Sequence, residues 1–151
     1  MRHSYLPVGV ALLLAGCARA AARPADLRHY TAPERAGSAA PLSDAVRVGG
    51  LLFLSGKLGT LPGQAGLVPG GIAAETRQAL ENVRATLEAN GSSLARVVKC
   101  TVFLASIGEW DAMNAVYRTY FPTNPPARTT VGGAQLVRNA RVEIECVAAA
   151  G

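Results

Sequence analysis

Histidine is nearly absent from this sequence. His3 and His29 are its two histidines, and both precede the region from Asp44 onward that has the pattern of a folded domain. A Ser-His-Asp triad and a metal centre with histidine ligands both require this side chain. The sequence therefore excludes these two chemistries from the domain.

Aromatic residues and clustered basic residues are also scarce. The 151 residues include four tyrosines, three phenylalanines and one tryptophan, so a core must consist mostly of Val, Leu, Ile and Ala. The net charge is +5, but the Lys and Arg residues are scattered and do not alternate with aromatic residues that could stack on bases. We interpret the charge as solvated surface and expect no nucleic-acid partner. The length suits one domain.

The N-terminus has the features of an export signal. Arg2 precedes an apolar run from Tyr5 to Ala15, and Leu14-Ala15-Gly16-Cys17 follows the pattern of a bacterial lipoprotein signal. We therefore predict a signal peptide at 1–16 and lipidation of Cys17. Two alternatives remain: an ordinary signal peptide cleaved after Ala18-Arg19-Ala20, and a core helix with an incidental cysteine.

The residues after Cys17 suggest where the protein is placed. Ala18 stands where an aspartate would indicate retention in the inner membrane, so we expect a lipid-anchored protein that faces the periplasm, at the outer membrane. Residues 17–43 are rich in Ala, Pro and Arg without strand or helix periodicity, which predicts an extended tether. The domain is predicted at 44–151.

Short apolar runs and glycines outline the first half of the domain. Val46-Arg47-Val48 and Leu51-Leu52-Phe53-Leu54 flank Gly49-Gly50, a spacing typical of a hairpin with a primed turn. Residues 59–71 are rich in Gly and Pro and predict a loop. Apolar residues at helical spacing predict a helix from Ile72 to Ala89, with Gly91 as its C-terminal cap.

The second half continues with a strand, a helix and two more strands. Ser106-Ile107-Gly108-Glu109 resembles a capping box, and Pro125-Pro126 would end the helix region. Two helices over one sheet face predict a two-layer α+β domain of order ββαβαββ. The predicted elements are a strand at Val97–Leu104, a helix to about Phe121 with a buried stripe of Trp110, Met113, Tyr117 and Tyr120, and strands at Thr129–Val137 and Arg141–Ala148 joined by a short polar turn.

Polar residues at four positions are candidates for a site. In the last strand the period of two places Glu143 and Glu145 on the face away from the helices, where a solvated surface is the simpler interpretation. Arg128 could grip a carboxylate with two hydrogen bonds or form a structural salt bridge. Asn114 lies on the apolar side of its helix and could be a core amide with satisfied hydrogen bonds.

The domain contains two cysteines. Cys100 and Cys146 both fall on the helix-facing side of their predicted strands, which favours buried free thiols. An exported location would permit a disulfide between them instead.

Five segments, taken in order and spacing, resemble the Rid family, the YjgF-like reactive-intermediate deaminases, over Val46 to Ala148. The segments are Leu52-Phe53-Leu54-Ser55-Gly56, Gln78-Ala79-Leu80-Glu81-Asn82-Val83, Val97-Val98-Lys99-Cys100-Thr101-Val102-Phe103-Leu104, Pro126-Ala127-Arg128 and Val142-Glu143-Ile144-Glu145. The resemblance implies a chorismate-mutase-like homotrimer whose sheets line a central barrel, with clefts between subunits. It further implies hydrolysis of small carboxylate-bearing enamines or imines, such as 2-aminoacrylate, to 2-keto acid and ammonia, without metal or cofactor.

The resemblance also assigns roles to individual residues. Arg128 matches the arginine that binds the substrate carboxylate, and Glu143 matches the glutamate that positions the attacking water. Substrate-binding positions are matched at Ser55, Gly56, Asn114 and Thr130, the last standing where the best-studied branch has a cysteine.

The chain departs from that branch at two further places. Leu42 stands where the branch has a pocket tyrosine, and Gly132-Gly133 replace bulkier residues, which should loosen the strand. These changes bear on the choice between two functions. The sequence predicts an enamine or imine deaminase, and the alternative is a non-catalytic trimer that binds a small carboxylate at the cell envelope.

Overall fold

The structure, a computed structural model, describes residues 26–151. The predicted signal peptide, Cys17 and the first part of the predicted tether lie outside the described residues. Among the residues described, no helix is both long enough and apolar enough to cross a membrane.

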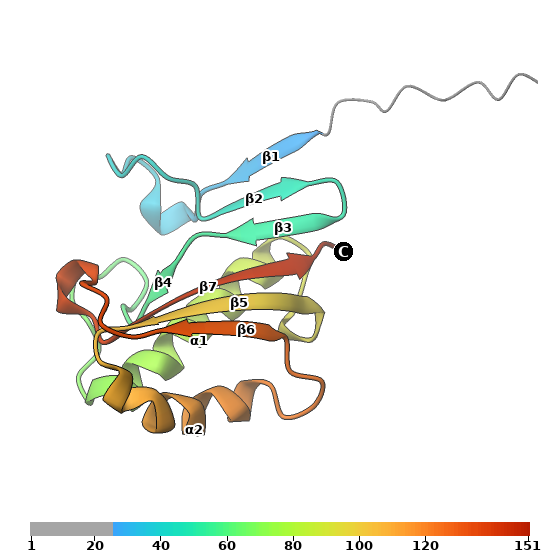
Figure 1. The fold of residues 1–151 in the computed structure, drawn as a ribbon. Helices are drawn as coiled ribbons and strands as arrows, with labels where there is room; N and C mark the ends of the chain where they lie inside the picture. The colour runs from blue at the N-terminus through green and yellow to red at the C-terminus, as the bar shows by residue number, and fades with distance from the viewer. Residues whose placement is uncertain (1–25) are drawn as a thin grey trace, which may run out of the picture.

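A mixed seven-stranded sheet forms one layer of the domain (Figure 1). Neighbouring strands are antiparallel except β5 and β6, which are parallel. The spatial order is β1 (Leu27–Tyr30), β2 (Ala45–Val48), β3 (Leu51–Leu54), β7 (Val142–Ala149), β5 (Val97–Leu104) and β6 (Ala127–Val131), and the short β4 (Lys57–Leu58) pairs with the start of β7.

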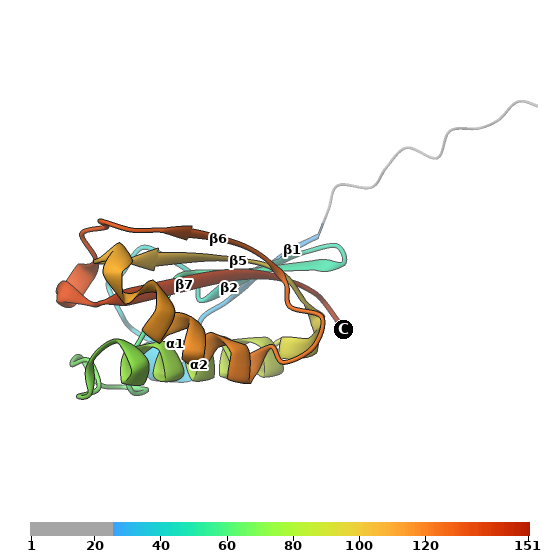
Figure 2. The same ribbon diagram turned by 60° about the horizontal axis from the view of Figure 1, so that its bottom comes forward.

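Both long helices lie on the same face of this sheet, as Figure 2 shows. Helix α1 spans Gly71–Ala89 and α2 spans Trp110–Tyr120. Their apolar sides and the inward residues of the central strands form one core, and these side chains are fully buried. The predicted two-layer α+β class is therefore confirmed. The core includes Leu80, Val83 and Leu87 of α1, Met113 of α2, Val102 of β5 and Ile144 of β7.

Two predicted glycine turns are present. Gly49 has a φ of 55° at the tip of the β2–β3 hairpin, as a primed turn requires. Gly91 has a φ of 72° directly after α1, where the N–H groups of Gly91 and Ser92 bond to the carbonyls of Glu88 and Leu87. Both glycines end their elements where the sequence pattern predicted.

Part of the segment predicted as a tether forms regular structure before Asp44. Residues Leu27–Tyr30 form β1 and pair with all four residues of β2, and a 3-10 turn follows at Pro33–Arg35. This pairing satisfies backbone groups of β2 that would otherwise form an open sheet edge. The segment has too few apolar residues to show a strand pattern, and the backbone pairing explains why it is nevertheless a strand.

The end predicted for the strand at Thr129–Val137 is wrong, and so is the short polar turn predicted after it. β6 ends at Val131 and pairs with β5, which lies between β6 and β7. Gly133 has a φ of 79°, and the chain then crosses the sheet end through a 3-10 turn at Val137–Asn139. Gly132 does not loosen the strand either, because a Cβ there would lie 2.5 Å from Cβ of Ile107. It permits close packing.

Two details of the second helix also differ from the prediction. Trp110 is 40% exposed rather than buried, because it stands at the first position of α2, while Met113 and Tyr117 are buried. Ser106 accepts a hydrogen bond from the Gly108 N–H, but the carboxylate of Glu109 bonds to Arg141 instead of completing a capping box.

Cys100 and Cys146 form a disulfide within the core. The two residues face each other directly in the β5–β7 ladder, and both are nearly fully buried. The disulfide replaces the free thiols that the sequence favoured. It closes a loop over a sequence separation of 46, which constrains the unfolded chain.

We expect the double substitution C100A/C146A to lower the free energy of unfolding by about 2 to 4 kcal/mol. Chemical denaturation with and without reductant measures this. Reductant should destabilise the wild type and leave the double variant unchanged. An intact mass that does not rise by a pair of hydrogens on reduction of the unfolded chain would contradict the bond.

Candidate active site

The predicted site residues fall into two groups on opposite faces of the sheet. In the β5–β6 ladder Arg128 lies opposite Cys100, and Thr130 lies opposite Val102. Residues paired across neighbouring strands point to the same face. Since Cys100 and Val102 are buried under the helices, Arg128 and Thr130 also point to the helix-covered side.

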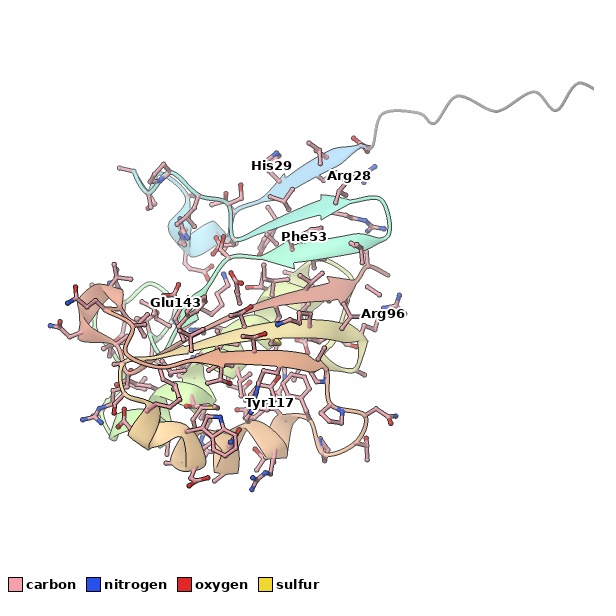
Figure 3. The ribbon with its side chains drawn as sticks, viewed as in Figure 1. Arg28, His29, Phe53, Arg96, Tyr117 and Glu143 are labelled. Carbon is pink, nitrogen blue, oxygen red and sulfur yellow. A yellow bond between two sulfur atoms is a disulfide. The ribbon has the colours of Figure 1, made fainter. Side chains whose placement is uncertain are left out.

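The two glutamates of β7 point the other way. Glu143 lies opposite Phe103 and Glu145 opposite Thr101, in the alternate positions of β5. Figure 3 shows Glu143 at the sheet end next to β4, whereas Tyr117, which contacts Arg128, lies between β6 and α2. We call Gly56 and Glu143 the glutamate group, and Arg128, Thr130, Asn114 and Tyr117 the arginine group.

In the glutamate group, the side chain of Glu143 packs closely against Gly56. A Cβ on Gly56 would lie 2.0 Å from Oε1 of Glu143, so no larger residue fits while the glutamate keeps this position. Glu143 is half-buried. Burial, and secondarily the charge of Glu145, raise the pKa of Glu143 above its usual value. A raised pKa makes this carboxylate a stronger base near neutral pH.

Gly56 and Glu143 line a groove of about 500 Å³. Its walls come from the segment before β2, the loop after β4, the middle of α1 and the β6–β7 connection. The arginine group does not line this groove. Within one chain, the structure therefore brings Gly56 and Glu143 together and leaves Arg128, Asn114 and Thr130 apart from them.

Ser55 anchors the groove wall. Its hydroxyl donates to the carbonyl of Ser43 at 2.6 Å, and its N–H donates to the carbonyl of Asp44. The Ser55 side chain is thus engaged by the segment before β2. This contact positions the segment, and the substrate contact that the resemblance implies for Ser55 stays a prediction.

A buried ion network holds the same segment. The carboxylate of Asp44 accepts hydrogen bonds from Lys57 Nζ at 2.6 Å, from Arg35 at 3.3 Å and from the Ala32 N–H at 2.9 Å. Burial alone would raise the pKa of Asp44, but the hydrogen bonds from Lys57 and Ala32 and the charges of Lys57 and Arg35 outweigh it and lower the pKa. Asp44 therefore stays ionised and fixes both cations.

The arginine group lies between β6 and α2. The Arg128 guanidinium sits over the ring of Tyr117, with its central carbon 4.6 Å from the ring centroid. Burial raises the pKa of Tyr117 to about 12, against the opposing effect of Arg128. The hydroxyls of Tyr117 and Thr130 are buried and have no hydrogen-bond partner in the structure of residues 26–151. Asn114, one turn before Tyr117 on α2, is buried as well.

Sequence reasoning missed Tyr117 as part of the site. Its apolar neighbours made it a core residue of α2, which it also is. The available signal was its spacing of three from Asn114, which places both on one helix face. Among the described residues, no three His, Cys, Asp or Glu side chains gather so as to hold a metal ion.

Comparisons with known proteins identify the family. A family model described as Endoribonuclease L-PSP matches residues 32–150. The chain belongs to the endoribonuclease L-PSP family. A goat relative named 2-iminobutanoate/2-iminopropanoate deaminase is 44% identical over 111 residues, which cover 74% of this chain and 81% of the relative.

Solved structures of similar proteins agree with the fold. A yeast protein is 39% identical with a TM-score of 0.78, covering 83% of this chain and 100% of its own. A YjgF-family protein from Neisseria meningitidis is 29% identical with a TM-score of 0.70, covering 83% and 96%. The resemblance to YjgF-like proteins is thus confirmed as to family and fold.

We expect G56A to lower the free energy of unfolding by about 0.5 to 1.5 kcal/mol, because the new methyl group forces the flexible Glu143 side chain out of its present rotamer. In an E143A background the same substitution should cost less than about 0.5 kcal/mol, since its clash partner is gone. Denaturant unfolding of the four proteins measures the coupling. G50A is the matched control, because a Cβ there meets nothing within 4 Å. Equal costs in both backgrounds would contradict the contact.

Proposed function

We propose that this protein hydrolyses small 2-imino and 2-enamino carboxylates to 2-keto acids and ammonia, in a cleft that two copies of the chain share. The observation that carries the proposal is that the polar residues form two groups. The arginine group suits a substrate carboxylate, and the glutamate group offers a base. The names of the curated relatives support it, since they are called 2-iminobutanoate/2-iminopropanoate deaminases.

Arg128 supplies the binding half. Its planar guanidinium can hold a substrate carboxylate with two parallel hydrogen bonds. The Tyr117 ring beneath it fixes the plane of the guanidinium, and cation–π contact of this kind is strongest where water is excluded. The substrate's carboxylate is thereby held in one orientation, which places its C=N carbon at a defined distance from the base.

Glu143 supplies the chemical half. Ionised, it accepts a proton from a water molecule while the water oxygen forms a bond to the C=N carbon, and the imine nitrogen takes up a proton. In the resulting carbinolamine the proton held by Glu143 passes to the nitrogen, and the C–N bond breaks to release ammonia. The hydroxyl oxygen then forms the C=O bond of the keto acid and loses its proton to solvent, which balances the proton that the imine nitrogen took from solvent. Holding both reactants converts a bimolecular hydration into a nearly unimolecular step.

The proposed site needs a second copy of the chain, because Arg128 and Glu143 of one chain cannot reach the same substrate. Arg128 and Glu143 point to opposite faces of the same sheet. The open face also exposes two large apolar side chains, Leu51 and Phe53 of β3. Burial of such side chains favours association, and a head-to-tail contact that closes after three copies gives the homotrimer that the resemblance implies.

The family description names a ribonuclease, but the features of this chain favour the deaminase. His29, the histidine nearest the domain, is exposed on β1 and contacts the Ser43 hydroxyl at 3.2 Å. It lines neither group of the site. An RNA-binding surface would also need stacked aromatic residues in a basic groove, which the sequence does not provide.

The shared cleft predicts complementation between two inactive variants. We expect R128A and E143Q each to abolish release of keto acid from imines generated by an amino-acid oxidase. Co-assembled in equal amounts, they should recover about a quarter of wild-type activity, since one cleft in four draws its arginine and its glutamate from chains that retain them.

The control mixture is R128A with R128A/E143Q, which contains no intact arginine and should stay inactive. Size-exclusion chromatography must show that each variant assembles. No recovery from folded, mixed trimers would contradict a cleft shared between copies, and wild-type inactivity on all imines would leave the non-catalytic carboxylate-binding trimer as the function.

We further propose that the protein is exported and anchored through a lipid on Cys17, facing the periplasm at the outer membrane. The Leu14-Ala15-Gly16-Cys17 pattern supports this placement. The Cys100–Cys146 disulfide supports it independently, because disulfides persist in oxidising compartments.

In a bacterial host, C17S should release the protein from the membrane fraction into soluble periplasmic extract. Loss of the acyl chains removes the anchor, since stable anchoring needs more than one chain. Fractionation with immunodetection measures this, and C100A/C146A, which keeps Cys17, should remain in the membrane fraction. Membrane association that survives C17S would contradict the anchor.

A further inference from the structure

The groove that holds Glu143 is far larger than a three-carbon substrate needs. At ~30 Å³ per water molecule, its volume of about 500 Å³ corresponds to many more atoms than 2-aminoacrylate contains. The neighbouring copy that supplies Arg128 covers part of this space, and a three-carbon substrate at Glu143 would leave the rest to water. Ligand sites normally bury most of the ligand's surface, so the remaining space favours a longer substrate.

Exposed apolar side chains gather on this groove. Leu42, Leu61 and Val137 are 48%, 40% and 66% exposed, and all three line it. They come from three separate segments, namely the segment before β2, the loop after β4 and the β6–β7 connection. Single exposed apolar residues are ordinary on a protein surface, but their convergence on one concave site marks a binding surface.

These apolar walls are held in place by hydrogen bonds. Arg35 donates to the carbonyl of Leu42 and to Asp44, which fixes the first wall. Arg138, next to Val137, donates to the carbonyl of Ala65 and ties the other two walls together. A groove fixed in this way loses little entropy when it closes on a ligand.

The charges along the groove are engaged with protein partners. Lys57 and Arg35 bind Asp44, and Arg138 binds a backbone carbonyl. The charged side chain that remains at the groove is Glu143, together with exposed Glu34. The three cations are offset by three carboxylates, those of Asp44, Glu34 and Glu143, so the groove has no excess positive charge that would favour an acidic substrate side chain.

From this geometry we infer that the preferred substrates carry a long or branched aliphatic side chain, as in the imine derived from leucine, rather than the short chains of the alanine-derived imine and 2-aminoacrylate. The inference rests on the proposed function and specifies its substrate class. The substrate carboxylate faces Arg128 of a neighbouring copy, the C=N carbon faces Glu143, and the side chain packs against Leu42, Leu61 and Val137.

The test compares imines generated from alanine, 2-aminobutyrate, norvaline and leucine, with release of keto acid measured against trapping by semicarbazide. We expect kcat/KM for the leucine-derived imine to exceed that for the alanine-derived imine by about tenfold or more, since burial of each added methylene favours the larger substrate. L42A should lower activity on the leucine-derived imine several-fold more than on the alanine-derived one. L27A removes a leucine on β1 that is 58% exposed and lies outside the groove, and it should change neither activity.

Binding of the product keto acids separates this inference from the proposed function. Calorimetry with pyruvate and 4-methyl-2-oxopentanoate should show tighter binding of the latter, weakened by L42A. If no imine is hydrolysed but this selectivity is present, the deaminase proposal fails and the apolar specificity stands. Equal affinities, or a loss on L42A that is the same for both ligands, would overturn the inference and assign the groove to another occupant, such as a second copy of the chain.

Discussion

The alternation of side chains along β5 is the constraint on which the site depends. Cys100 and Val102 must face the helices to complete the core, so the residues paired with them share that face. Arg128 and Thr130 are thereby committed to the covered side, and Glu143, opposite Phe103, to the open one. A slip of one residue would reverse every side chain of a strand. The proposed chemistry therefore requires a second copy of the chain, because no rearrangement of side chains within one chain would bring Arg128 and Glu143 to the same face.

A second constraint holds the groove beside Glu143. The Asp44 carboxylate is buried with two cations and a backbone N–H, and it joins the segment before β2 to β4. Buried ion pairs add little net stability, because desolvation offsets their attraction, but they admit few alternative geometries. Their role here is to define the position of the wall that carries Leu42. The Asp44 network therefore has two effects: it orders the segment before β2, and it fixes the groove surface that we propose contacts the substrate.

The spacing of apolar residues predicted the helices and strands that bury one side. It failed for segments that are strands because of their backbone pairing. Helix α1 and strand β5 were predicted closely because their apolar residues recur at the spacing of one buried side. Strand β1 has no such pattern, since three of its four residues are exposed and its backbone pairing with β2 defines it. The end of the strand predicted at Thr129–Val137 failed for a related reason: apolar residues continue to Val137, whereas pairing with β5 stops at Val131. Arg128 and Glu143 were found by resemblance, but their opposite faces follow from register, which no local pattern reveals.

The disulfide acts on the same register. Cys100 is paired with Arg128 on one side and with Cys146 on the other, so the covalent bond lies in the row of the ladder that carries the arginine. Glu143 lies three residues from Cys146 on the same strand. Linking Cys100 to Cys146 forbids any slip of β5 against β7, and this fixes the parity that sends the arginine and the glutamate to opposite faces. In a reducing compartment, side-chain packing alone would have to maintain the register of β5 and β7. In an oxidising compartment the disulfide maintains this register covalently. The same pair of cysteines therefore supports both the placement of Arg128 and Glu143 on opposite faces and the proposed location of the protein.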